Sequence, residues 1–199
     1  MVSKNSLENL YLKSKKSSAE ISSIFKCSEN KVNYWLAKYG IKKRSISEAV
    51  YLKNNPRGDP FKIKKPKNMQ EAELRGLGFG LYWGEGTKAN KNTIRLGNTD
   101  PNLISKFLEF MIKIYGVKKR DFKFGLQIFS DMNPKEALRF WTRYLGVGAD
   151  QFQKVVVTPA RSLGTYRNKT RHGVLTVNYN NKNLRDELGR GLKKFGFVE

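Results

Sequence analysis

Leu74-Arg75-Gly76-Leu77-Gly78-Phe79-Gly80-Leu81-Tyr82-Trp83-Gly84-Glu85-Gly86 is the stretch of sequence that indicates the fold. Gly76, Gly80 and Gly84 recur every four residues, which places them on one face of an α-helix. Each glycine inside a helix costs about 1 kcal/mol relative to alanine, so this stripe needs a structural reason. The usual reason is close packing against a second helix. Because the stripe ends at Glu85, two such helices would bring two carboxylates together, which suits a divalent cation.

The segment Phe79-Gly80-Leu81-Tyr82-Trp83-Gly84-Glu85-Gly86 resembles the signature helix of the LAGLIDADG homing endonucleases. In this resemblance Gly80 and Gly84 take the positions of the small residues through which two signature helices touch. Glu85 takes the position of the metal-binding acid, which is more often aspartate, and Trp83 replaces an earlier, non-catalytic aspartate. The alternative explanation is a tightly packed core helix with a surface glutamate at its end.

The signature occurs once in the chain, and family members with one copy act as homodimers. The resemblance therefore implies a dimer through Gly76, Gly80 and Gly84 that reads a near-palindromic site in duplex DNA. It also implies Mg²⁺-dependent phosphodiester cleavage, in which Glu85 and the Gly84 carbonyl hold the metal. The candidates for a further catalytic side chain that orders water are Lys182 and Gln127. For both, a solvated or DNA-contacting side chain is the alternative.

The chain of 199 residues has a formal net charge of +22. Residues 1–50 contribute +6, residues 51–70 contribute +5 and residues 71–199 contribute +11, so the charge is not confined to a tail. This distribution favours an extended polyanion, and we expect duplex DNA. We expect no membrane contact, because the sequence has neither a long apolar run nor a lysine-rich amphipathic helix. A cytoplasmic, nucleoid-associated location follows. The single cysteine, Cys27, and the single histidine, His172, exclude an internal disulfide and a structural zinc site.

Residues 1–50 are expected to form a small all-α domain of the helix-turn-helix type. Serines stand where helices would begin, and Lys26-Cys27-Ser28 supplies the tight turn. The stretch from Ser18 to Leu36 resembles the resolvase-type and repressor-type DNA-binding families. The alternative is a small protein-interaction module, which fits the positive charge less well. The candidate DNA contacts lie on the third helix and in the basic run after it: Asn30, Lys31, Asn33, Tyr34, Lys42, Lys43 and Arg44.

Residues 51–70 are rich in proline, asparagine and lysine and are expected to be a basic linker. From Glu71 the order helix, strand, helix, strand, helix, two strands, helix predicts an α+β domain over residues 71–199. The domain resembles one LAGLIDADG unit over about residues 71–195, whose antiparallel sheet forms a saddle over DNA. The expected strands are Thr93–Asn98, Phe122–Ser130, Phe152–Thr158 and Gly173–Asn180.

Alternation along these strands sorts their side chains into an inward and an outward set. The outward residues Arg95, Lys123 and Gln127 are candidates for contacts to base edges in the major groove. The connection over residues 161–171 contains four basic residues and no acid, and we interpret it as a long hairpin tip that lies on phosphates. Its candidate contacts are Arg161, Arg167, Lys169 and Arg171.

Two functions follow from these features. The first is a site-specific DNA endonuclease of the kind found in introns, inteins and mobile elements, and the presence of Glu85 favours it. The second is a non-cleaving DNA-binding transcription regulator. It is favoured by the separate N-terminal domain and by the absence of a lysine on the strand where the resemblance places one near the metals. An RNA-splicing cofactor is a third possibility, but a helix-turn-helix domain favours duplex DNA.

Overall fold

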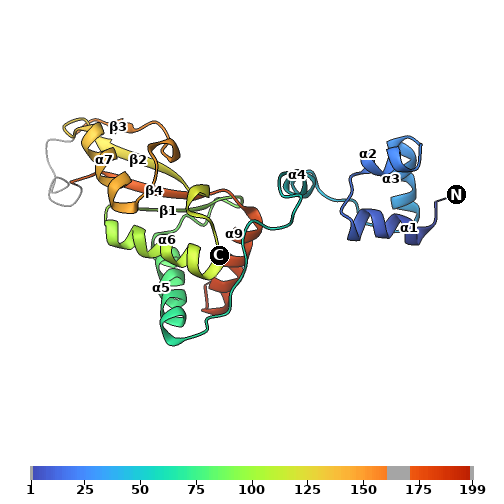
Figure 1. Cartoon of the computed structure of the whole chain (residues 1–199), viewed down its shortest axis with the longest axis horizontal. Coiled ribbons are helices and arrows are strands. Elements are labelled where there is room, and N and C mark those ends of the chain that lie inside the picture. Colours follow the sequence, from blue (N-terminus) through green and yellow to red (C-terminus); the bar gives the residue numbers. More distant parts are fainter. Residues whose placement is uncertain (1, 161–170, 198–199) are drawn as a thin grey trace. The chain divides into compact units, whose positions relative to one another are not determined.

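We analysed a computed structural model of the chain, which describes residues 2–160 and 171–197. The chain divides into two compact units, Met1–Asp59 and Pro60–Glu199 (Figure 1). The first unit is helical and the second contains helices and a sheet, so the α+β class is confirmed. No helix in the described part of the chain is both long and apolar enough to span a membrane.

The N-terminal unit consists of short helices whose starts are set by serine caps. Ser17 accepts from the Glu20 N–H while Glu20 accepts from the Ser17 N–H, forming a capping box at the second α-helix. The third helix begins after Ser28, whose hydroxyl accepts from the Lys31 N–H. The helices are α1 (Lys4–Glu8), the π-helical turn η1 (Asn9–Lys13), α2 (Ser18–Ile24), α3 (Glu29–Lys38) and α4 (Ile46–Asn54).

A small apolar core holds α1, η1, α2 and α3 together. Between α2 and α3 the chain turns at Lys26, which has a left-handed φ of 49°. Cys27 follows and packs against the core, as a small hydrophobic side chain would. The buried members of this core are Leu7, Tyr11, Ile21, Val32, Leu36 and Ile41.

The expected linker over residues 51–70 is partly structured. Helix α4 extends into it as far as Asn54. Further on, the Lys62 N–H donates to the Tyr115 carbonyl and the side chain of Phe61 is buried in the core of the second unit. The end of the expected linker is ordered because Phe61, an apolar side chain within an otherwise polar and basic stretch, is buried in this core.

The second unit has the predicted order of elements, and its helix ends carry the expected signals. Asp100 caps α6 at its N-terminus, and Gly116 ends it with a left-handed φ of 63°. Asn133 and Gly146 do the same for α7. The α-helices are α5 (Met69–Glu85), α6 (Pro101–Tyr115), α7 (Pro134–Leu145) and α9 (Lys182–Lys194). The 3₁₀ turns are η2 (Lys119–Asp121) and η3 (Ala149–Gln151). The strands are β1 (Ile94–Asn98), β2 (Lys123–Phe129), β3 (Val156–Thr158) and β4 (Val174–Tyr179).

The sheet has the strand order β1-β4-β2-β3 and is mixed. β4 pairs antiparallel with both β1 and β2, but β3 pairs parallel with β2. The expectation of a wholly antiparallel sheet was therefore wrong at β3. The cause is α7, which carries the chain back across the sheet between β2 and β3, as a parallel crossover requires. β3 and β4 are not neighbours in the sheet, so these two strands do not form the expected hairpin, and residues 161–170 of their connection lie outside the described part of the chain.

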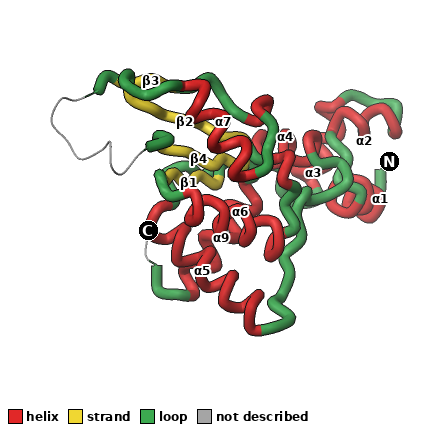
Figure 2. The backbone as a smooth tube through the Cα atoms, turned by 60° about the vertical axis from the view of Figure 1, so that its left-hand side comes forward, coloured by secondary structure: helices red, strands yellow, loops and turns green. Residues whose placement is uncertain are grey.

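One face of the sheet is covered by helices and the other is open. In Figures 1 and 2, α5, α6 and α9 lie together on one side of the strands. Trp141 of α7 belongs to the same core as the inward residues Leu96 and Leu126. Two glycines allow close packing there: the ring of Phe110 lies against Gly78, and the ring of Phe79 lies against Gly191.

Candidate nucleic-acid interface

The uncovered face of the sheet carries the outward side chains of all four strands. Arg95, Lys123 and Gln127 are exposed there, in agreement with the alternation seen in the sequence. Neighbouring outward residues form three rows across the sheet: Arg95, Asn178 and Lys123; Gly97, Thr176 and Gly125; and Val174, Gln127 and Val156.

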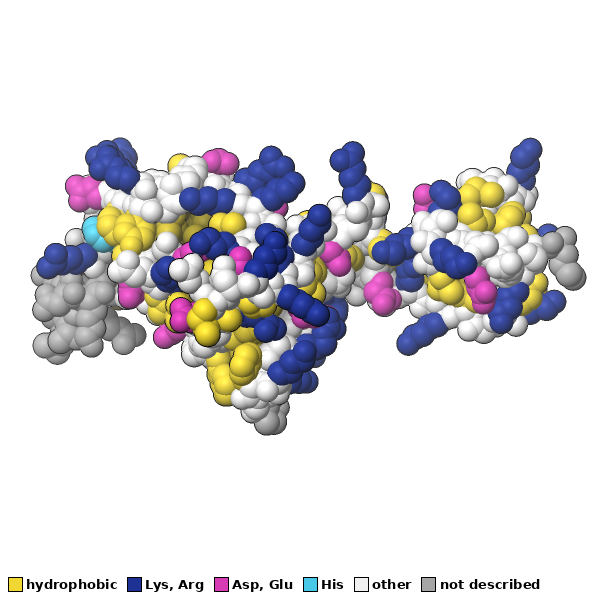
Figure 3. All heavy atoms as spheres, turned by 60° about the horizontal axis from the view of Figure 1, so that its bottom comes forward, with side chains coloured by type: hydrophobic (Ala, Val, Ile, Leu, Met, Phe, Trp, Pro, Cys, Tyr) yellow, Lys and Arg dark blue, Asp and Glu magenta, His cyan; other side chains and the backbone are white. Residues whose placement is uncertain are grey.

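None of these outward positions is acidic, although the chain has 17 Asp and Glu residues. The row formed by Arg95, Asn178 and Lys123 combines two cations with an amide, and Gln127 adds a second amide. Arginine, lysine and amides are the side chains that contact phosphates and base edges. Figure 3 shows Lys and Arg side chains spread over both units on the face that it draws. The chemistry of the open sheet face therefore matches a nucleic acid.

Helix α5 exposes the glycine stripe instead of burying it. Gly76, Gly80 and Gly84 are exposed, and a Cβ added at any of them would meet nothing within 4 Å. The same face carries Leu77 and Trp83, which are 46% and 41% exposed. Exposed helix faces are usually polar, so a smooth apolar face of this kind is typical of a contact surface. Within the described residues the stripe does not pack inside the protomer, whereas the opposite face of α5 is buried through Leu74, Phe79 and Tyr82, as the alternative of a core helix with a surface glutamate also expects.

Glu85 is the last residue of α5, and its side chain is exposed. The next residue, Gly86, leaves the helix in an extended conformation and forms a bridge with Leu96 of β1. A Cβ at Gly86 would lie 2.4 Å from the Tyr82 carbonyl oxygen, so only glycine fits at this exit. The acid is therefore held where α5 runs onto the edge of the sheet.

Lys88 is the basic side chain beside Glu85, and the sequence did not single it out because it lies in a short loop and not on one of the expected strands. Its ammonium donates to the Trp83 carbonyl at the end of α5. Burial lowers the pKa of this ammonium, and the Glu85 carboxylate acts in the opposite direction. The loop after Glu85 thus carries a partly buried cation close to the acid.

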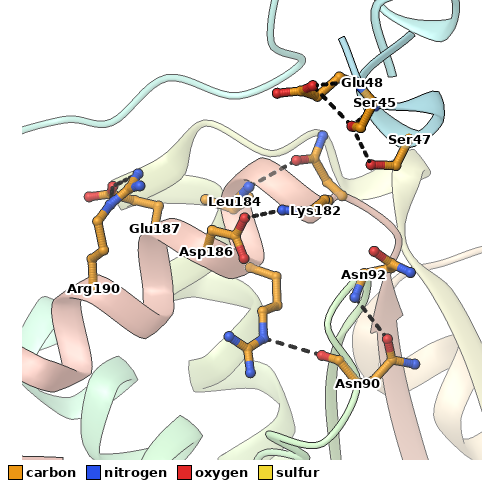
Figure 4. A network of polar contacts seen from close by, with 12 residues as sticks. Ser45, Ser47, Glu48, Asn90, Asn92, Lys182, Leu184, Asp186, Glu187 and Arg190 are labelled. Atoms are coloured by element: carbon orange, nitrogen blue, oxygen red, sulfur yellow. Dashed lines mark hydrogen bonds and ion pairs between the residues drawn. The ribbon is translucent and has the colours of Figure 1, made fainter. Parts of the chain in front are cut away.

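Arg185 of α9 holds this loop in place and was also missed. Its side chain is 9% exposed, and its guanidinium donates to the carbonyls of Lys88 (2.6 Å) and Asn90 (3.2 Å). Figure 4 shows the bond that reaches Asn90 from α9. A buried arginine that donates charge-assisted hydrogen bonds to two carbonyl oxygens of a loop fixes the position of that loop. The sequence signal was an arginine among the apolar residues Leu184 and Leu188 of an amphipathic helix.

The two side chains proposed to assist catalysis are placed differently from Lys88. Lys182 begins α9, and its ammonium lies 2.5 Å from the Asp186 carboxylate (Figure 4). Gln127 lies on β2, two strands away from Leu96 and three residues along, on the order of 14 Å between Cα atoms by sheet spacing. The structure therefore does not bring Gln127 to Glu85 of the same protomer, because its strand is separated from β1 by β4.

On α3, the candidate contacts Asn30, Lys31 and Tyr34 are exposed, and Tyr34 is 61% exposed. Asn33 is half-buried, and its amide oxygen accepts from the Ser18 hydroxyl at 3.2 Å. This bond joins α2 to α3, so the amide oxygen of Asn33 is used inside the N-terminal unit.

Arg44 is not available for DNA, in contrast to its exposed neighbours Lys42 and Lys43. Its guanidinium lies 4.1 Å from the centre of the Tyr11 ring and donates to the carbonyls of Tyr11, Lys15 and Lys16. These carbonyls lie at and just after the C-terminal end of η1, where the helix itself supplies no N–H donors for them. The prediction of a phosphate contact at Arg44 is therefore replaced by a structural role.

The structure describes only part of the connection between β3 and β4. Arg161, Arg167 and Lys169 lie outside the described residues. Arg171 is exposed. His172, next to it, stacks on Phe140 with ring centres 3.5 Å apart.

In comparisons with known proteins, no protein-family model, no curated protein and no solved structure matches the chain.

Proposed function

We propose that the protein binds duplex DNA as a homodimer and cleaves a phosphodiester bond with the help of Mg²⁺. The observation that carries the proposal is the exposed glycine face of α5, which ends at Glu85 beside the open face of the sheet. A second copy packed on that face would bring the two Glu85 residues together. The open faces of both sheets, whose outward rows contain no acidic residue, would then contact one duplex.

The donor atoms of one protomer make half of a magnesium site. In the described residues there is no group of three or more His, Cys, Asp and Glu side chains that could hold a metal ion. Glu85 supplies one carboxylate, and no described hydrogen bond uses the Gly84 carbonyl oxygen. These oxygen donors fit Mg²⁺, and a dimer would double them.

Bound there, Mg²⁺ would lower the pKa of a coordinated water and offset the negative charge that develops on the phosphate. The chain's own residues would do the remaining work. Glu85 would hold the site at the junction of α5 and β1, and Arg185 would keep the following loop rigid. Arg95 and Lys123 would bind and orient the DNA backbone.

The dimer is tested by the solution mass of the protein with and without DNA. Gly80→Leu fills the open face of α5 and should leave a monomer, while Ser105→Leu adds the same side chain to an exposed site on α6 and should not. A parent protein that remains a single subunit on its DNA would contradict the proposal.

Cleavage is tested on duplexes selected from a random pool and incubated with Mg²⁺. Glu85→Gln keeps the size of the side chain but removes its charge, so binding should persist while the cleavage rate falls about a hundredfold or more. Cleavage that is unaffected by this change would remove Glu85 from the mechanism.

A non-cleaving DNA-binding regulator is the second candidate. The observation that favours it is the single carboxylate that each protomer places at the end of α5, with no metal-binding cluster among the described residues. Specific binding without cleavage by the parent protein, at any Mg²⁺ concentration, would establish this alternative.

A further inference from the structure

Helix α7 carries a groove on its exposed side. The groove has a volume of about 340 Å³ and is lined by Glu136, Arg139, Phe140, Arg143 and Tyr144. We refer to it as the α7 groove. Trp141, on the other side of the helix, is buried in the core. The groove is therefore presented by a helix that the core holds in place, and none of its lining residues belongs to the outward rows of the sheet.

The floor of the α7 groove is part of a stack of flat rings. Phe140 stacks on His172, with ring centres 3.5 Å apart and an interplanar angle of 11°, and also on Tyr144, with ring centres 5.7 Å apart and an interplanar angle of 25°. The Tyr144 hydroxyl donates to the Asn102 amide oxygen at 2.7 Å, which fixes the ring. Tyr144 is 42% exposed and ends the stack. A further flat ring placed on it would continue the stack, as bases do on aromatic side chains.

The walls of the α7 groove supply charge. Arg139 and Arg143 are exposed, one helical turn apart, and neither guanidinium forms an ion pair with any described residue. Free guanidiniums on an aromatic surface bind phosphates and stack on bases. Glu136 adds one carboxylate, which can accept from a base amino group but disfavours a bare phosphate ion.

We propose that the α7 groove binds one unpaired nucleotide of a polynucleotide strand. Its aromatic floor matches a base and its arginines match the flanking phosphates. Its volume lies near the lower end of the range for small-molecule sites, so it suits a single nucleotide and not a duplex. The inference extends nucleic-acid binding to a second surface and does not depend on metal or on cleavage.

Fluorescence anisotropy with three labelled DNAs tests the proposal: a blunt duplex, the same duplex with a short single-stranded overhang, and the single strand alone. One stacked base should make the overhang duplex bind about tenfold more tightly than the blunt one. Arg139→Ser with Arg143→Ser, and separately Tyr144→Ala, should reduce this preference to about onefold. Tyr144→Phe keeps the ring and should keep most of the preference.

The matched control is Lys118→Ser with Arg120→Ser, which removes two exposed charges outside the α7 groove and should leave the preference unchanged. Equal affinities of the parent for blunt and overhang duplexes, or an intact preference in the variants, would overturn the proposal. So would displacement by a free mononucleotide in the absence of an overhang preference, because the site would then belong to a small ligand. The proposed function is read separately, from blunt-duplex binding and Mg²⁺-dependent cleavage in the same samples.

Discussion

The ring of Phe110 lies so close to Gly78 that a Cβ added there would be 2.1 Å from the Phe110 Cγ. Two residues further along α5, the same addition at Gly80 would meet nothing within 4 Å. The two glycines therefore have different structural roles. Gly78 allows α6 to approach α5 inside the protomer, whereas Gly80 belongs to the face that α5 leaves open.

Alanine substitutions at these two glycines should change stability in opposite directions. Gly78→Ala should lower the free energy of unfolding by about 2–3 kcal/mol, because the added methyl group overpacks the contact with Phe110. Gly80→Ala should raise it by about 1 kcal/mol, because the methyl group enters open space and alanine favours a helix. Urea unfolding of dilute protein measures both changes, and a stabilising Gly78→Ala would contradict this packing.

Arg44 should matter for folding and Lys43 for DNA binding. Arg44→Ala leaves the carbonyls of Tyr11, Lys15 and Lys16 without a charged donor, so the N-terminal unit should lose about 2 kcal/mol. Arg44→Lys should restore little of this, because an ammonium cannot form the same fork. Lys43→Ala should leave stability unchanged. Thermal unfolding followed by circular dichroism tests all three variants, and equal effects at residues 43 and 44 would refute the assignment.

His172 should stay neutral to a lower pH than an ordinary histidine. Burial is the main cause that lowers the pKa of its imidazole, and Arg171 adds to the effect. The unfolded chain therefore takes up the proton first, so stability should fall as the pH drops from the ordinary histidine value towards the folded one.

The chain has a single histidine, so proton NMR can follow its titration without assignment. Phe140→Leu removes the stacked ring and should move the pKa of His172 back towards its usual value. A titration curve at or above the ordinary histidine pKa in the parent protein would contradict the observed environment.

Charges on the open face of the sheet should control the salt dependence of DNA binding. Arg95→Ala and Lys123→Ala should each weaken binding and reduce the slope of log K against log salt by about 1. Lys106 is the control, because it lies on α6 and is paired with Glu109 at 2.8 Å. Binding measured from low to moderate salt gives the slopes, and an equal change for Lys106→Ala would show that only net charge matters.

The helix boundaries could be predicted because their causes are local. Asp100 and Gly116 mark the ends of α6 through contacts within a few residues, and Asn133 and Gly146 do the same for α7. The alternation that turns Arg95 outward and Leu96 inward is likewise a property of the strand itself. The exposure of Glu85 at the end of α5 follows from the same local reasoning.

Contacts between distant residues could not be read from the sequence. Whether β3 runs parallel or antiparallel to β2 depends on how α7 packs between them. The sequence does not show that Gly78 meets Phe110, or that Arg185 reaches the carbonyl of Lys88. Local geometry and hydrogen bonding determine the elements and their faces. Only the packing of these elements decides which charged groups stay free for a ligand and which are used inside the molecule.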